Sequence, residues 1–280
     1  MRMLSLAHLT LLDVSPPELV GAAAGAGFDG VGIRLGRGAQ PTDPDWPMLG
    51  DTAMRRDTRQ RLSDTGLQVL EVEGVSILAG RAIADLKRLD ALLESANVLG
   101  ARFLTVASFD SDLAHSANEL ATLCALAAPY GLQPVVEFLA RSGVTRLEQA
   151  ATLVAQPGCE RAGILMDVLH LFRTGGSLKD LDGDAVVRIA LVQLCDAPRE
   201  RPAEEAEQRA ESRNRRLPGE GELPLTEVLS RLPADMPISV EAPAARLAGL
   251  AAAERARLAH AAARHVLDSC IQVFQHVDLD

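Results

Sequence analysis

The sequence has few aromatic residues, few cysteines and no excess of basic residues, and each absence narrows the class of protein. Only 3% of its 280 residues are aromatic, and Trp46 is the one tryptophan. The four cysteines lie far apart with no Cys-x-x-Cys pair, which argues against a disulfide framework or a thiolate zinc site and favours a reducing, cytoplasmic environment. No apolar run reaches the roughly 18 residues of a membrane helix, so we expect no membrane partner.

The charge balance argues against a nucleic-acid partner. The chain has 28 Lys and Arg residues against 38 Asp and Glu residues, a formal net charge of −10. An acidic surface repels phosphate backbones unless a basic patch is strongly localised. The length, without internal repeats, suits one large α/β domain, which at this size builds a core without metals or disulfides.

Short apolar runs alternate with longer helical patterns along the whole chain, and several runs are continuously apolar, as is typical of a parallel sheet covered on both faces. The predicted strands are Leu4–Thr10, Gly30–Leu35, Gln68–Val75, Ala101–Ala107, Gln133–Phe138, Gly163–Asp167, Ala190–Asp196 and Pro237–Glu241. The predicted helices are Pro16–Ala26, Ala53–Thr65, Ile83–Leu99, Ser111–Tyr130, Thr145–Ala155, Asp180–Arg188, Leu225–Leu232 and Ala251–Ser269.

Eight such βα units in 280 residues predict a single (β/α)8 TIM barrel spanning residues 1–280. The alternative is an open doubly wound sheet, but no glycine-rich phosphate loop follows the first strand. Two long connections, 36–51 and 197–224, are expected at the barrel mouth. The second is charge-dense and is alternatively a solvated helical insertion. Trp46 lies in the first and is predicted to wall off a substrate pocket.

Polar side chains end four consecutive predicted strands. These residues are Glu137, Asp167, Gln193 and Glu241. In a barrel of this kind the chemistry lies at the carboxyl ends of the strands. Buried carboxylates are costly unless they are paired, and a divalent cation is the simplest partner for several of them together. Oxygen ligands favour Mg²⁺ or Mn²⁺. The alternative is that each acid pairs with a neighbouring Arg or Lys.

Two histidines lie near predicted strand ends. His170 follows Asp167 by three residues, which places it beside the expected metal and predicts contact with the substrate. His8 lies near the end of the first strand and is a second candidate for the mouth. A lone histidine in such a position is otherwise a structural hydrogen-bonding group.

The sequence resembles the sugar isomerase/epimerase-like TIM barrels related to xylose isomerase. The resemblance is carried by Val135-Val-Glu-Phe, Ile164-Leu-Met-Asp-Val-Leu-His, Val192-Gln-Leu-Cys-Asp-Ala, Arg216-Leu-Pro-Gly-Glu-Gly-Glu-Leu and Ser239-Val-Glu. It covers essentially the whole chain.

The resemblance implies a metal-dependent isomerase or epimerase of a sugar or keto-sugar that acts through an enediolate. It implies that Glu137, Asp167, Gln193 and Glu241 are the metal ligands, with Mn²⁺ or Mg²⁺ favoured and Co²⁺ or Zn²⁺ as alternatives. Glu137 and Glu241 are then expected to transfer the proton. His170 and Arg199 match residues that contact the substrate. The same superfamily contains zinc endonucleases of abasic DNA, but the acidic charge and scattered histidines argue against that activity.

Two departures keep other functions open. The third ligand is most often histidine in epimerases, whereas Gln193 stands here, as in barrels that resemble 3-dehydroshikimate dehydratase. The region after Glu137 reads Leu139-Ala-Arg-Ser-Gly and lacks a second glutamate. The alternatives are therefore a metal-dependent dehydratase and a barrel that binds a small polyol or sugar acid without turnover. Alanine- and leucine-rich helices also suit a homodimer.

Overall fold

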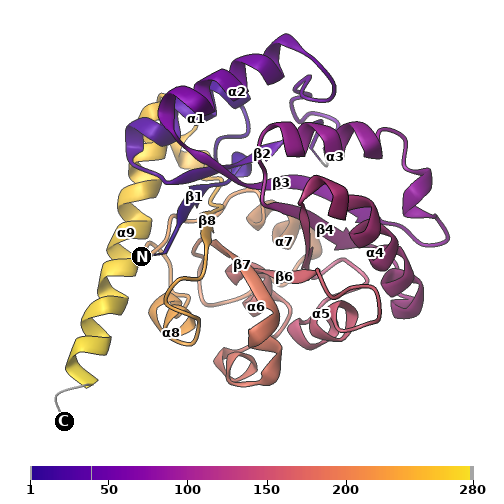
Figure 1. The fold of residues 1–280 in the computed structure, drawn as a ribbon. Helices are drawn as coiled ribbons and strands as arrows, with labels where there is room; N and C mark the ends of the chain where they lie inside the picture. The colour runs from indigo at the N-terminus through magenta and orange to yellow at the C-terminus, as the bar shows by residue number, and fades with distance from the viewer. Residues whose placement is uncertain (1, 39, 278–280) are drawn as a thin grey trace.

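A computed structural model describes residues 2–38 and 40–277, and it confirms the predicted barrel (Figure 1). Eight parallel strands follow one another in chain order and close where β8 pairs with β1. The strands are β1 (Leu4–Leu6), β2 (Gly30–Arg34), β3 (Gln68–Ile77), β4 (Phe103–Ser108), β5 (Gln133–Glu137), β6 (Gly163–Asp167), β7 (Ile189–Leu194) and β8 (Ile238–Val240).

Helices surround the barrel (Figure 1). They are α1 (Pro16–Ala26), α2 (Ala53–Thr65), α3 (Leu89–Val98), α4 (Leu113–Ala127), α5 (Leu147–Val154), α6 (Val168–Arg173), α7 (Glu205–Glu211), α8 (Leu225–Ser230) and α9 (Ala252–Val277). None of the described helices combines the length and the apolar character needed to cross a membrane.

Local sequence signals set the ends of the first helix. Ser15 and Glu18 form a capping box at the start of α1, and Pro16 occupies its first position. Gly27 ends the helix with a φ of 94°, a backbone conformation that glycine adopts without strain. The chain then turns directly into β2.

The helix α6 was not predicted, α7 lies where a helical insertion was the alternative to a mouth loop, and three predicted elements differ clearly from the observed ones. The first strand ends at Leu6, and a 3₁₀ helix over His8–Leu11 follows it. The predicted helix Asp180–Arg188 is instead two short 3₁₀ helices, Leu178–Asp182 and Asp184–Arg188. The predicted helix Ile83–Leu99 is divided, because Arg88 adopts a positive φ of 75° immediately before α3.

The inside of the barrel changes from apolar to polar along the strands. A buried apolar cluster fills the part of the barrel nearer the amino ends of the strands and consists of Leu70, Phe103, Val135, Leu165 and Leu191. Because side chains of a strand alternate between two faces, the residue two positions further on points to the same side. In β4 to β7 those residues are Thr105, Glu137, Asp167 and Gln193. The apolar layer is therefore the floor on which the polar site rests.

Candidate metal and substrate site

The four predicted metal ligands lie at the carboxyl ends of β5 to β8. Three of them, with Arg215 and His170, line one cavity of about 180 Å³ at the barrel mouth. Its lining residues are Leu9, Arg34, Glu73, Thr105, Glu137, Leu139, Arg141, His170, Gln193, Ser212, Arg213, Arg215 and Glu241. Asp167 lies against this group through Arg215 and His170.

A second cavity of about 500 Å³ continues from the first toward β2 to β4. The two cavities share Arg34, Glu73, Thr105, Glu137 and Leu139. Both long connections reach this space. Residues of 36–51 line the second cavity, and residues of 197–224 line the first.

Arg215 holds two of the acids together. Its Nη1 lies 2.6 Å from Asp167 Oδ2, and its Nη2 lies 3.0 Å from Glu241 Oε2. All three side chains are buried. Burial raises the pKa of Asp167, but Arg215 and His170 outweigh it, and the pKa is lowered overall. The predicted alternative of arginine pairing thus applies to these two carboxylates.

A buried aspartate fixes the loop that carries Arg215. Asp196, two residues beyond β7, accepts hydrogen bonds from the backbone N–H groups of Ala197, Gly219, Gly221 and Leu223 at 2.8–3.1 Å. Its own backbone pairs with that of Arg216, the neighbour of Arg215. These hydrogen bonds therefore bring Arg216, which is 20 residues further along the chain than Asp196, back to the end of β7.

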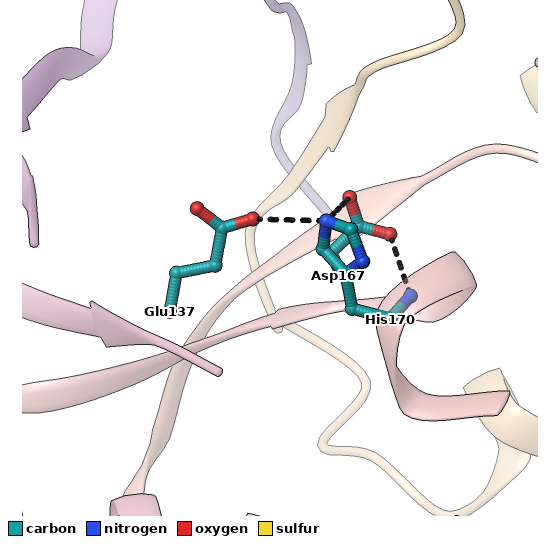
Figure 2. A group of neighbouring side chains, drawn as sticks. All are labelled: Glu137, Asp167 and His170. Atoms are coloured by element: carbon teal, nitrogen blue, oxygen red, sulfur yellow. Dashed lines mark hydrogen bonds and ion pairs between the residues drawn. The ribbon is translucent and has the colours of Figure 1, made fainter. Parts of the chain in front are cut away.

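Asp167 also orients His170 (Figure 2). Asp167 Oδ1 accepts hydrogen bonds from the backbone N–H of Leu169 and His170, and it thereby caps the short helix α6. The imidazole Nε2 then lies 3.6 Å from Glu137 Oε1 and 3.9 Å from Asp167 Oδ2. Burial lowers the pKa of His170 to about 4, so the ring is neutral at pH 7.

Glu137 and Gln193 lack strong partners. Among the described residues, the one basic nitrogen within 4.0 Å of the Glu137 carboxylate is His170 Nε2. Removal from water raises the pKa of Glu137 well above its ordinary value, and Glu241 and Asp167 raise it further. Gln193 Nε2 donates to Glu241 Oε1 at 2.9 Å, but its Oε1 is buried with no hydrogen-bond partner. Burial also raises the pKa of Glu241 to about 7.

These residues fit a divalent cation. One ligand atom from each of Glu137, Asp167 and His170 lies within 4.8 Å of the others. Arg215 carries one positive charge and pairs with Asp167 and Glu241 but not with Glu137, so two of the three negative charges stay unbalanced when all three acids are ionised. A divalent ion would balance them, and the unpartnered Gln193 Oε1 offers a further oxygen ligand.

His8 has a structural environment. It is completely buried, its Nδ1 accepts a hydrogen bond from the Arg34 backbone N–H at 3.1 Å, and its Nε2 lies 2.9 Å from Val14 O. The imidazole therefore connects β1 to the end of β2 and positions Arg34. It does not line either cavity, so the structure gives its predicted substrate contact no support.

Trp46 and Arg199 also lie outside both cavities. Trp46 is partly buried and packs against the hydrophobic core. Arg199 is exposed, and its backbone N–H donates to Glu222 Oε2. The guanidinium that reaches the acids belongs to Arg215, which the sequence analysis missed. Arg215 lies two residues before the Leu217-Pro-Gly-Glu-Gly motif, a position that did not distinguish it from the other arginines of this segment.

Other cavity residues were also missed. Arg34 Nε lies 2.5 Å from Glu73 Oε2, with Arg34 at the end of β2 and Glu73 within β3. Thr105, Arg141, Ser212 and Arg213 are further polar residues of the lining. The sequence did contain a signal for Arg34 and Glu73, because the alternation of side chains along a strand places both on the inward face, which also carries the predicted ligands.

Comparison with known families decides the classification. A model of the xylose isomerase-like TIM barrel family matches residues 20–269. The chain belongs to this family. A sequence comparison with curated proteins finds no match.

Solved structures share the xylose isomerase-like fold at low sequence identity. An IolI protein with a bound zinc atom has a TM-score of 0.79 and 19% identity, over 96% of this chain and 99% of that one. D-psicose 3-epimerase from Clostridium cellulolyticum H10, solved with D-tagatose, has a TM-score of 0.69 and 16% identity, over 95% and 99%. A xylose isomerase-like TIM barrel/4-hydroxyphenylpyruvate dioxygenase fusion protein has a TM-score of 0.80 and 22% identity. The similarity covers 98% of this chain but 44% of the fusion protein.

Proposed function

We propose that this barrel is a divalent-metal-dependent isomerase or epimerase of a keto-sugar. The observation that carries the proposal is the surplus of negative charge at the mouth, where one guanidinium pairs with Asp167 and Glu241, Glu137 has no arginine or lysine partner among the described residues, and the amide oxygen of Gln193 is unpartnered. The zinc-containing IolI structure and the D-psicose 3-epimerase structure support a metal and a sugar substrate for this fold.

The ligands that we propose for the metal are Glu137, Asp167, Gln193 and Glu241. Their oxygen atoms favour Mn²⁺ or Mg²⁺, with Co²⁺ or Zn²⁺ as alternatives. When bound, such an ion would polarise the substrate carbonyl and offset the negative charge that develops on its oxygen.

The side chains around the cavity provide the proton transfer. The carboxylate of Glu137 takes the proton from the carbon next to the carbonyl and later releases it to water, and Glu241 takes up a proton from water and gives it to that carbon from the other side. The stereocentre is thereby inverted without a change in composition. The neutral His170 ring holds a substrate oxygen, and the positive charge of Arg215 offsets the negative charge that develops on the substrate.

A second candidate reaction is dehydration, and Gln193 is the observation that favours it. The third proposed ligand is an amide, Gln193, rather than a histidine. Its Nε2 donates a hydrogen bond to Glu241, and an amide does not accept a proton as a base would. In that reaction Glu137 removes the same proton, a carbon–carbon double bond forms, and the hydroxyl on the next carbon leaves and takes up a proton to give water. Both reactions therefore share their first step.

Solvent-deuterium incorporation tests the first step. Metal-loaded protein in D₂O is expected to place deuterium on the α-carbon of a keto-sugar, and Glu137→Gln is expected to abolish the incorporation. Glu200→Gln, which changes an exposed carboxylate on the 197–224 connection, is the control and is expected to keep it. An ultraviolet-absorbing aromatic product from 3-dehydroshikimate would identify the dehydratase instead. Ligand binding that survives Glu137→Gln, without exchange in the unchanged protein, would indicate a binding protein.

A further inference from the structure

The cavity beside the proposed metal site contains an unusual number of arginines. Four of its thirteen lining residues are Arg34, Arg141, Arg213 and Arg215. In a chain with a net charge of −10, four positive side chains thus lie around the proposed substrate site. Guanidinium groups bind carboxylates and phosphates through paired hydrogen bonds, so their own partners need to be accounted for.

Three of the four arginines are paired with acids of this chain. Arg215 is held by Asp167 and Glu241, as described above. Arg34 pairs with Glu73 at 2.5 Å. Arg213 pairs with Asp43 of the 36–51 connection, so this ion pair joins the two long connections at the barrel mouth.

Arg141 has no such partner. Among the described residues, none forms a hydrogen bond or an ion pair with its side chain, which is exposed and lines the cavity. It lies four residues after Glu137 and lines the same cavity as Glu137 and His170. Its positive charge is therefore directed toward the same space as the reacting groups.

The backbone around Arg141 is fixed. Ser142 Oγ donates to the carbonyl oxygens of Leu139 and Val144, and Gly143 N–H donates to Ser108 O at 2.6 Å. A Cβ on Gly143 would lie 1.8 Å from Asp110 O, so only glycine permits this contact with the end of β4. The loop thus holds Arg141 at the mouth.

A second donor in the cavity has no hydrogen-bond acceptor. Arg34 Nη1 is buried and forms no hydrogen bond, although it lies 3.7 Å from the carboxylate oxygen Asp43 Oδ2, while Arg34 Nε donates to Glu73. A buried N–H without an acceptor is unfavourable. Because Arg34 lines both cavities, a substrate oxygen is a suitable acceptor.

With a divalent ion bound, the charges around the cavity would balance except for one positive charge. A divalent ion with Arg215 balances Glu137, Asp167 and Glu241, while Arg34 balances Glu73 and Arg213 balances Asp43. Arg141 leaves one positive charge. A carboxylate carries one negative charge, whereas a phosphate monoester carries nearly two at pH 7.

We propose that the substrate carries a carboxylate group, which Arg141 binds, and that Arg34 Nη1 donates to a second substrate oxygen. The substrate class is then a keto-sugar acid or a cyclic hydroxy-keto acid rather than a neutral sugar. This inference rests on the proposed function for the position of the metal and the reacting carbon.

Titration calorimetry of the Mn²⁺-loaded protein with matched probes tests the inference. One pair is D-fructuronate and D-fructose, which differ in a terminal carboxylate, and the other is 3-dehydroshikimate and its methyl ester. We expect at least one carboxylate to bind tenfold or more tightly than its neutral partner. Arg141→Met is expected to remove that preference without changing the affinity for the neutral probe, and Arg141→Lys to restore part of it. Arg146→Met is the matched control, because Arg146 lies on the same loop, is exposed and does not line the cavity.

The inference is overturned if neither carboxylate binds better than its neutral partner, the absence of all binding included, or if the preference survives in Arg141→Met. Tighter binding of D-fructose 6-phosphate than of D-fructuronate would also overturn it in favour of a phosphoryl group. Deuterium exchange separates this result from the proposed function. A carboxylate preference without exchange retains the inference and contradicts the function, whereas exchange on neutral sugars alone does the reverse.

Discussion

The two halves of the barrel differ in how they neutralise the acids that point into it. In the β1–β4 half, Glu73 pairs with Arg34, and Glu71 is protonated at neutral pH because burial raises its pKa to about 8. In the β5–β8 half, Arg215 is the one arginine or lysine among the described residues that pairs with the three acids, and it pairs with Asp167 and Glu241 but not with Glu137.

This contrast indicates a division of roles. The β1–β4 half is balanced within itself and provides walls and hydrogen-bond donors for a substrate. The β5–β8 half is stable in its ionised form only when an outside positive charge completes it, because unpaired buried charges are strongly unfavourable. We therefore expect the proposed metal to bind in the β5–β8 half of the barrel and not in the β1–β4 half.

Removing the guanidinium from the β5–β8 half is expected to have the largest effect on stability. Arg215→Met leaves Asp167 and Glu241 buried without their cation, and the loss of one partner from a buried ion pair typically costs about 3–5 kcal/mol. We expect a loss of this size in the free energy of unfolding, measured by denaturant titration of metal-free protein at pH 7. Arg34→Met, the corresponding change in the other half, is expected to cost less, because Glu73 is 17% exposed to the cavity and retains contact with water. Equal losses in the two variants would contradict the contrast.

The residues of the β5–β8 site could be predicted because each one belongs to a strand. Glu137, Asp167 and Gln193 each come at the end of an apolar run, two positions after an apolar residue that points into the barrel. This pattern can be recognised in a single sequence. The barrel itself was predictable for the same reason, since the strands recur with helical segments between them. Sequence reasoning succeeded wherever local periodicity fixes the side chain's direction.

The residues supplied by long connections could not be placed in this way. Arg199 and Arg215 both follow β7 in a segment rich in arginine and glutamate, and nothing in the spacing says which returns to the barrel. The distinction depends on the four hydrogen bonds that Asp196 accepts from the loop, which are contacts between distant parts of the chain. For His8, the position near a strand end was predicted from the sequence, but the complete burial of the side chain was not.

Metal binding is expected to have the next largest effect, and only through the β5–β8 half. A ligand present at 100 times its dissociation constant stabilises a protein by about 2.7 kcal/mol. We expect Mn²⁺ at that excess to raise the melting temperature of the unchanged protein and EDTA to reverse the rise. Glu137→Gln removes a proposed ligand and is expected to lose most of the increase, whereas Glu73→Gln in the other half is expected to keep it. An increase that depends on Glu73 rather than Glu137 would place the metal in the wrong half.

The smallest effect concerns the pH dependence of stability and tests whether the β1–β4 half is neutral. Glu71 is completely buried, and Ser239 Oγ donates to its Oε1 at 2.5 Å, while Glu71 Oε2 has no partner. Its pKa of about 8 in the folded protein exceeds the ordinary value of 4.5. Between these values the folded state holds a proton that the unfolded state releases. Stability therefore falls as the pH rises through this window, by at most about 1.4 kcal/mol per pH unit.

Glu71→Gln is expected to remove this contribution, since the amide keeps an acceptor for Ser239 and cannot ionise. The variant should match the unchanged protein in stability near pH 5 and exceed it at pH 9, in denaturant titrations with saturating Mn²⁺ so that the proposed metal ligands stay ionised. Glu200→Gln, an exposed carboxylate, is expected to leave the pH profile unchanged. If Glu71→Gln is less stable than the unchanged protein at pH 9, then Glu71 is ionised in the folded state. A cation must in that case lie against it, and the charge surplus would extend into both halves of the barrel.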